Sequence, residues 1–474
     1  MAEPVAASRL LDTLRLAERP RPRAVARWPH AHWLAVGTVC LGAFLGQLTA
    51  SVTSLVFPAL EGHFDAAFAA VEWVSLAYLL VLVALLAPVG RLSDLVGRKA
   101  MYLGGFAVFA AASLGAGLAG NLGVLVTCRA VQAVGGAMMQ ANSVALVARG
   151  VPERAMRTAL GVQAAAQALG LALGPTLGGL LVAHASWRWA FWVNVPIAAL
   201  GVLTGWFLLP RTFPDGRRPA RAAREGRFDL AGLLLLAASS TALLLALSAA
   251  SGLPLPGWAV AGLPVAAAAG TLALVRRERR ADRPIIPPGL VNTPGIRAGL
   301  LVALSGYLLL FCPLVLEPVV LAGRGTTAAA AGAAITALPA AFALAATAGG
   351  ALLPRRWNDA ARCRCGALTA AAGLLALAAL PAPGPWTTAA ALLPTGYGLG
   401  LLLPANNALV MRAIPAQSSA VGGGLVNMVR SLGTALGTAL PVLAVHQAGT
   451  AAGGRAVPLL LAVVAALAVR LCRD

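Results

Sequence analysis

The sequence predicts an all-α membrane protein with 14 transmembrane helices, arranged as two parallel six-helix halves with two helices inserted between them. The 474 residues are 59% hydrophobic and 11% charged, with a mean hydropathy of +0.81, whereas soluble domains carry about 25% charged residues. A membrane-spanning helix needs about 20 mostly apolar residues. Fourteen such runs are expected, at 33–58, 70–89, 100–119, 122–147, 158–183, 189–209, 230–250, 257–275, 298–322, 329–353, 366–381, 386–410, 419–445 and 455–471.

Basic residues lie on alternate loops between these runs. One side, with residues 1–31 and the C-terminus, carries 31 of the 36 Lys and Arg, and the other carries only Arg188, Arg324 and Arg455. Cytoplasmic loops are enriched in Lys and Arg. We therefore expect a multi-pass protein of the cytoplasmic membrane with both termini in the cytoplasm. The net charge of +20 then reflects topology and not nucleic-acid binding.

An internal repeat relates the two halves. The stretch 141–152 resembles 405–415 with one gap, and beyond their final prolines a constant offset of 263 aligns three glycines of each half. Parallel repeats of this kind form transporters that hold the substrate between the halves. The expected units are a basic tail without a signal-peptide core, an N-terminal half, loops with two linker helices, and a C-terminal half, at 1–31, 32–209, 210–294 and 295–472.

The segment GRLSDLVGRK joins the second and third runs. Its two glycines allow close backbone approach, and its aspartate can cap a helix or accept a bidentate arginine, so we expect a tight turn. The segment resembles the signature G-x-L-x-D-x-x-G-R-[KR] of the major facilitator superfamily at every fixed position. The resemblance implies alternating access, with a cytoplasmic latch formed by Gly90, Arg91, Asp94, Gly97, Arg98 and Lys99.

The fourth run contains a second motif-like pair. Arg129 lies about 12 Å inside the run at helical rise, and Gln132 shares its face. The pair resembles R-x-x-Q-G of the same superfamily, with Ala133 in place of glycine. A buried arginine should face a cavity or a partner. Arg129 therefore either bonds neighbouring carbonyls or takes part in proton transfer or substrate contact.

The fifth run ends in a stripe of small residues, which is typical of closely packed helices, and in a proline that bends the helix. The stripe resembles the motif that marks exporters of the superfamily. Over about 33–472 the chain resembles the 14-span drug:proton antiporter family in particular, through segments at 73–78, 187–196 and 228–232. The expected helix-packing residues are Gly170, Gly174, Pro175, Gly178 and Gly179.

Proton coupling needs a titratable group, and this family usually carries it as an aspartate in the first span, where this chain has Thr49. Among the acidic residues, only Glu72 and Glu317 lie within apolar runs. We interpret Glu72 as an interfacial carboxylate directed to water. Glu317 lies about 9 Å inside its run and is equally well an interfacial or a proton-coupling residue. The proton-coupling candidates are Glu317, Glu72 and Arg129.

Polar residues at membrane depth suggest where a substrate would bind. Carboxylates are scarce there and two arginines are present, which favours a neutral or anionic amphipathic substrate over a strongly cationic one. Many of these side chains could instead bond helix to helix. The candidates for the cavity are Gln47, Thr49, Gln132, Asn142, Gln167, Asn406, Asn407 and Arg430.

These patterns together predict a secondary active exporter of small amphipathic drugs or metabolites that works by proton antiport and functions as a monomer. The missing aspartate leaves a proton-independent or uptake facilitator open, and a non-transporting membrane sensor is the alternative of another class. Apart from the bilayer, the expected partners are the substrate and protons. The scattered cysteines and histidines provide no metal site, no cofactor motif occurs, and nothing favours an enzyme.

Overall fold

The computed structural model describes residues 21–211, 229–281, 288–352, 357–380, 384–414 and 419–472. Every element in these ranges is a helix, so the predicted fold class is confirmed. The first half contains α2 to α11, which are α2 (Arg23–Arg27), α3 (Ala31–Leu55), α4 (Phe57–Phe64), α5 (Phe68–Val71), α6 (Trp73–Val96), α7 (Arg98–Gly117), α8 (Leu122–Gly150), α9 (Glu153–His184), α10 (Trp189–Trp192) and α11 (Asn194–Leu208).

The inserted pair and the second half follow. These helices are α13 (Leu230–Ala250), α14 (Gly257–Arg280), α15 (Pro288–Val291), α16 (Pro294–Ala322), α17 (Ala328–Ile335), α18 (Ala337–Leu352), α19 (Asp359–Ala379), α20 (Pro385–Ala413) and α21 (Ser419–Leu471). Helix α21 consists of two helices joined at Gly449, whose φ of 74° interrupts the helix. Within the described ranges, 13 helices are long and apolar enough to cross a membrane, and the last candidate, Leu425–Leu471, includes both helices of α21. This is consistent with the 14 predicted spans.

Local sequence explains several helix ends. Asn121 caps α8, because its side-chain oxygen accepts the backbone N–H of Val124 at 2.9 Å, and Asp229 caps α13 in the same way through Gly232. Such caps satisfy backbone donors that a helix leaves free at its start. The predicted separation of the third and fourth spans at Gly120 and Asn121 is therefore seen in the structure.

The turn between α6 and α7 differs from the expectation. Helix α6 continues to Val96 and α7 begins at Arg98, so Gly97 alone, at φ 119°, forms the turn. Expecting a turn from Gly90 onward was wrong, because none of the residues at 91–96 prevents a helix from continuing. The positive φ at Gly97 is a conformation that glycine adopts readily.

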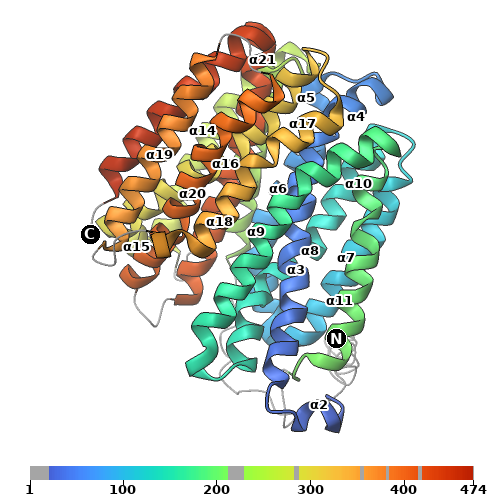
Figure 1. The fold of residues 1–474 in the computed structure, drawn as a ribbon, viewed down its shortest axis with the longest axis vertical. Coiled ribbons are helices and arrows are strands. Elements are labelled where there is room, and N and C mark those ends of the chain that lie inside the picture. Colours follow the sequence, from blue (N-terminus) through green and yellow to red (C-terminus); the bar gives the residue numbers. More distant parts are fainter. Residues whose placement is uncertain are drawn as a thin grey trace.

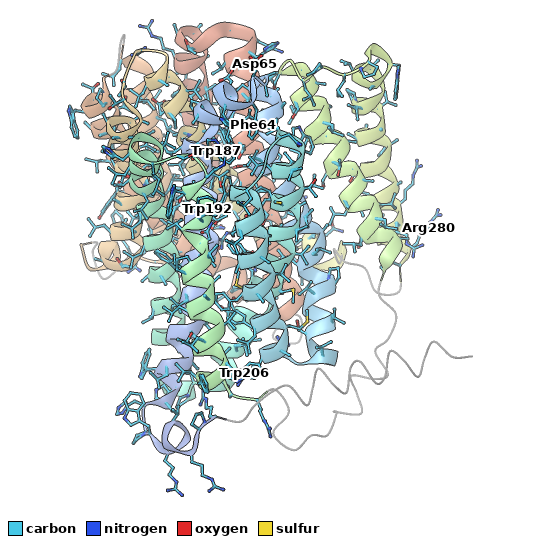
Figure 2. The ribbon with its side chains drawn as sticks, turned by 90° about the vertical axis from the view of Figure 1, so that its right-hand side faces the viewer. Phe64, Asp65, Trp187, Trp192, Trp206 and Arg280 are labelled. Atoms are coloured by element: carbon cyan, nitrogen blue, oxygen red, sulfur yellow. The ribbon has the colours of Figure 1, made fainter. Side chains whose placement is uncertain are left out.

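The two halves lie side by side, the first coloured blue to green and the second orange to red (Figure 1). Helix α13 contacts both α6 and α21, so the inserted pair covers one edge of the junction between the halves. Figure 2 shows this pair at the side of the molecule, with Arg280 at its end. The unit boundaries at 31, 209 and 294 stay predictions.

The halves make several contacts near the end of the molecule that contains Asp65, here named the Asp65 end (Figure 2). Thr176 of α9 and Thr336 share a hydrogen bond of 2.5 Å between their hydroxyl oxygens. Gly179 of α9 lies so close to α17 that an added Cβ would come within 2.6 Å of the Ala328 carbonyl oxygen. The rest of the glycine stripe faces α3, through Gly170, Gly174 and Gly178. The opposite end contains Gly97 and is named the Gly97 end.

Candidate functional site

A pocket lies between the halves, about midway along their long helices. It has an empty volume of about 700 Å³, part of which is open to solvent. Four polar or aromatic positions come from the second half, on α16 and α21, and the first half provides the rest. The lining residues are Gly42, Ala43, Gly46, Gln47, Ala50, Tyr78, Leu79, Leu82, Tyr102, Gly136, Met139, Gln140, Ser143, Gln163, Gln167, Phe311, Arg430, Ser431 and Thr434.

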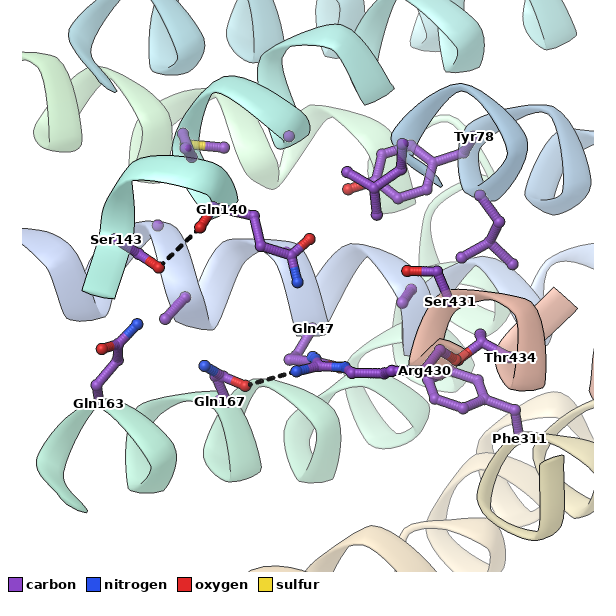
Figure 3. Close-up of a pocket in the computed structure, with 18 of the residues that line it drawn as sticks. Gln47, Tyr78, Gln140, Ser143, Gln163, Gln167, Phe311, Arg430, Ser431 and Thr434 are labelled. Carbon is purple, nitrogen blue, oxygen red and sulfur yellow. Dashed lines mark hydrogen bonds between the residues drawn. The ribbon is translucent and has the colours of Figure 1, made fainter. Parts of the chain in front are cut away.

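Arg430 is the charged residue in this lining. Its Nη1 donates to Gln167 Oε1 at 3.4 Å, which joins α21 of the second half to α9 of the first (Figure 3). The guanidinium carbon lies 4.9 Å from the centre of the Tyr307 ring, within cation–π range. Three of the predicted cavity residues, Gln47, Gln167 and Arg430, thus line one pocket.

Arg129 lies behind this pocket, in a buried polar network of the first half. Its Nε donates to the Val74 carbonyl oxygen at 2.8 Å, and its Nη1 donates to Gln132 Oε1. The series of hydrogen bonds continues from Gln132, whose Nε2 donates to Ser113 Oγ at 2.6 Å. The guanidinium carbon is 4.4 Å from the centre of the Tyr78 ring, and Tyr78 itself lines the pocket. Arg129 and Gln132 therefore support the pocket wall without lining it.

Four more predicted cavity residues lie outside the lining. Asn142 Nδ2 donates to Ser93 Oγ at 2.7 Å and to the Met138 carbonyl oxygen. Asn406 Nδ2 donates to the Gly299 carbonyl oxygen at 2.8 Å. These amides join helices, which is the alternative that the sequence left open. Thr49 is buried and Asn407 partly buried, and the Thr49 hydroxyl and Asn407 Oδ1 have no hydrogen-bond partner among the described residues.

Glu72 corrects its sequence interpretation. Its side chain is 0% exposed, and Oε1 accepts a hydrogen bond from the Ser248 hydroxyl of α13. The Trp73 indole N–H donates to the same hydroxyl oxygen at 3.1 Å. The expectation of an interfacial carboxylate directed to water was wrong, because the inserted helix α13 covers this position.

Glu317 is also buried, with 1% of its surface exposed. It lies in α16 between Pro313 and Pro318, two residues that lack a backbone N–H. Its Oε2 has no hydrogen-bond partner in the described part of the chain. Of the two membrane carboxylates, Glu317 thus has no side-chain donor among the described residues, whereas the Ser248 hydroxyl donates to Glu72.

The expected latch residues are placed in part. The single lysine, Lys99, is buried, and its Nζ donates to the carbonyl oxygens of Trp206 and Leu209 at 2.9 Å each. A cation at a helix C-terminus satisfies free carbonyls and complements the helix dipole, so Lys99 stabilises the end of α11. The side chains of Arg91 and Asp94 lie outside the described part of the structure, and the latch stays a prediction.

Several lining residues were missed as cavity candidates. Gln163 precedes the predicted Gln167 by four positions, and Gln140 precedes Ser143 by three. Residues at these spacings share one face of a helix. That periodicity is the signal that could have placed them in the pocket. Figure 3 shows the side chains of Gln140, Gln163 and Gln167 directed into the same space.

Most of the sequence matches a known protein family. The sequence model of the Major Facilitator Superfamily matches residues 39–438. The chain belongs to the Major Facilitator Superfamily. It is a multi-pass membrane transporter of this superfamily, and the resemblance seen in the sequence is confirmed.

Two superfamily relatives match most of the chain. The riboflavin transporter RibZ of Clostridioides difficile (strain 630) is 28% identical over 418 residues, covering 86% of this chain and 87% of RibZ. The tetracenomycin C resistance and export protein of Streptomyces glaucescens is 28% identical over 428 residues, covering 88% of this chain and 77% of that protein. By name, the first is a transporter and the second is a resistance and export protein.

The crystal structure of the human organic anion transporter MFSD10 has a similar fold. Its TM-score is 0.63 at 17% sequence identity, and the match covers 94% of this chain and 100% of that chain. At this identity the likeness shows the superfamily fold alone.

Proposed function

We propose that this transporter exports small amphipathic molecules across the cytoplasmic membrane in exchange for protons, as a monomer with both termini in the cytoplasm. The observation that carries the proposal is the pocket between two repeat-related halves, at mid-depth and lined by amides, aromatic rings and apolar side chains. Substrate sites of such transporters lie near the bilayer midplane at the repeat interface. The exporting relative and the arginine distribution support the direction and the orientation.

Contacts between the halves support loading from the cytoplasm. The Thr176–Thr336 hydrogen bond and the close approach of Gly179 to α17 hold the halves together at the Asp65 end. With the orientation proposed here, this end faces outward. A substrate would then enter from the Gly97 end and leave after these contacts open.

Two buried carboxylates could carry the proton. Neither Glu72 nor Glu317 forms one of the ion pairs seen among the described residues. A carboxylate buried outside an ion pair costs much less when it holds a proton, which suits a group that alternates between the two states. Glu317 is the first choice because no side-chain donor is seen on it in the described part of the chain, whereas the Ser248 hydroxyl donates to Glu72 Oε1.

Transport into everted membrane vesicles tests the proposal. Vesicles that contain the protein should accumulate a fluorescent amphipathic dye when their interior is made acidic, and should release it when an ionophore collapses the pH gradient. Asp94→Asn is the matched control, since it removes a charge with little change in volume and should abolish accumulation if the implied latch operates.

Two other results would contradict proton antiport. Accumulation that persists without the gradient would indicate a proton-independent facilitator, which the threonine at position 49 also favours. A folded protein that moves none of a broad panel of amphipathic compounds would indicate the non-transporting sensor.

A further inference from the structure

The surroundings of Arg430 are unusual for a cation in the middle of a membrane protein. None of the other residues lining the described pocket is charged, and the ion pairs seen at Asp229 and Asp359 involve other arginines, Arg277 and Arg412. A charge at membrane depth is costly unless it has a partner or faces a water-filled cavity. Arg430 has the pocket beside it, so its natural partner is a group that enters the pocket.

The contact with Gln167 is a weak substitute for such a group. A charge-assisted hydrogen bond from arginine to an anion is about 2.7–2.9 Å long, whereas the Gln167 amide oxygen is neutral and lies 3.4 Å away. Arginine has five N–H donors in a planar fork, and Tyr307 contacts a face of this plane. The edge of the guanidinium is thus available for a bidentate ligand.

We propose that Arg430 is an anion receptor that binds the carboxylate of a planar aromatic amphipathic substrate, and that Gln167 occupies this receptor when the pocket is empty. The inference deepens the proposed function, because it specifies the substrate class of the same pocket. The rings of Tyr78 and Phe311 and the side chains of Leu79 and Leu82 provide apolar contacts for the aromatic body.

When a substrate carboxylate replaces Gln167 at Arg430, a contact between the repeat-related halves is lost. Gln167 and Arg430 are separated by the repeat offset of 263, so equivalent positions of the two halves meet in the pocket. A carboxylate on Arg430 replaces a contact between the halves by a contact with the substrate. Binding therefore weakens the connection between α9 and α21, and a ligand that contacts the two conformations differently shifts the equilibrium between them.

Two xanthene dyes test the inference, because they share an aromatic body and differ in charge. Fluorescein is anionic and carries a carboxylate, whereas rhodamine 6G is cationic and has an ester in its place. Binding is measured by fluorescence polarisation with the purified full-length protein in detergent. We expect the wild type to bind fluorescein and to prefer it to rhodamine 6G.

Substitutions at the two contact residues sharpen the test. Arg430→Gln should weaken fluorescein binding by about tenfold to a hundredfold, the range for losing a hydrogen-bonded charge, and should leave rhodamine 6G unchanged or tighter. Arg430→Lys keeps the charge without the fork and should fall between. Gln167→Glu should weaken fluorescein binding by supplying an internal carboxylate, and Gln167→Ala should strengthen it.

Arg412→Gln is the matched control, because this arginine pairs with Asp359 at an exposed position outside the pocket. It should change neither affinity. Wild-type protein that does not bind fluorescein, or fluorescein affinity that is equal in wild type and Arg430→Gln, would overturn the inference. If Arg430→Gln does not fold, Gln167→Glu and Gln167→Ala with opposite effects still support the inference, and equal effects overturn it.

This assay separates the inference from the proposed function, since it measures binding without transport. Arg430-dependent fluorescein binding in a protein whose vesicles export nothing would support the receptor and reject export. Proton-driven dye export together with Arg430-independent binding would support export and reject the receptor.

Discussion

The two halves share one repeat but place their membrane arginines in different surroundings. In the first half, Arg129, Gln132 and Ser113 form a continuous hydrogen-bonded chain. In the second half, Arg430 instead lines the pocket and reaches across to Gln167 of the first half. Both halves contain buried polar atoms with no hydrogen-bond partner among the described residues, such as Thr49 Oγ1 in the first and Thr388 Oγ1 in the second.

Alignment of Asn142 with Asn406 shows the difference most directly. In that register Arg129 corresponds to Leu393, which is 49% exposed on the outside of the second half. We infer that the first half stabilises the pocket wall through Arg129, and that the second half supplies Arg430, which changes partners when a substrate binds.

The largest expected effect comes from joining the halves covalently. The hydroxyl oxygens of Thr176 and Thr336 are 2.5 Å apart, so the double variant Thr176→Cys/Thr336→Cys should form a disulfide. If the halves move as units during transport, the oxidised protein should lose all transport and a reductant should restore it. The measurement is dye accumulation in vesicles before and after reduction, alongside mass analysis of the cross-link.

The parent protein, with its six free cysteines, and each single variant are the controls. Full transport by protein that is shown to be cross-linked would mean that the halves do not separate at the Asp65 end.

The next effect concerns the hydrogen bonds of Arg129 in the first half. Gln132→Leu removes the acceptor of Arg129 Nη1 and leaves part of a buried charge without a hydrogen bond, which we expect to cost about 3 kcal/mol of unfolding free energy. Thr388→Val is the matched change in the second half, where the hydroxyl has no described partner, and should stay within about 0.5 kcal/mol. Thermal unfolding in detergent compares them, and equal losses would remove the distinction between the halves.

The third effect concerns the two membrane carboxylates. Glu317→Gln should reduce proton-driven efflux by about a hundredfold, the scale of a lost acid–base group. Glu72→Gln should have a smaller effect, since an amide oxygen can still accept the Ser248 hydroxyl. Efflux is compared with and without a pH gradient. Full proton-driven efflux in the double variant would exclude both carboxylates as the proton carrier.

The smallest effect is expected at the inserted pair. Burial opposes ionisation of Asp229, but hydrogen bonds from Arg277 and the Gly232 N–H outweigh it and hold the pKa of Asp229 below its ordinary value. A depressed carboxyl pKa contributes stability that is complete above the unfolded pKa of about 3.9 and is lost as the pH falls through the folded pKa. Asp229→Asn should therefore lower the melting temperature slightly at pH 7.

The same variant and the wild type should melt alike in strong acid, once Asp229 is protonated in both states of the wild type. A difference in melting temperature that persists unchanged in acid would show that the Arg277 ion pair does not cause the effect.

Sequence patterns predicted the positions of the helices well, but they did not predict which side chains contact one another. The apolar runs placed the helix ends within about seven residues, and the repeat offset of 263 aligns Gln167 with Arg430, which are in contact in the structure. Both results follow from periodicities along one chain.

Partners that lie far apart in sequence leave no such local signal. Glu72 is buried because Ser248, 176 residues away, covers it. Asn142 and Asn406 could not be separated from cavity residues, because an amide that faces a neighbouring helix has the same spacing as one that faces a pocket. Hydropathy does not distinguish a buried carboxylate from an interfacial one, or an amide that joins helices from one that lines a pocket.

The buried position of Lys99 gives the protein a chemical reporter. It is the single lysine of the chain, its side chain is 0% exposed, and its amine is held by two carbonyls of the α11 end. An amine-acylating reagent can modify this amine only when α7 and α11 separate there. The rate of lysine acylation, followed by mass spectrometry, therefore measures how often one defined helix contact opens, without any substitution in the chain.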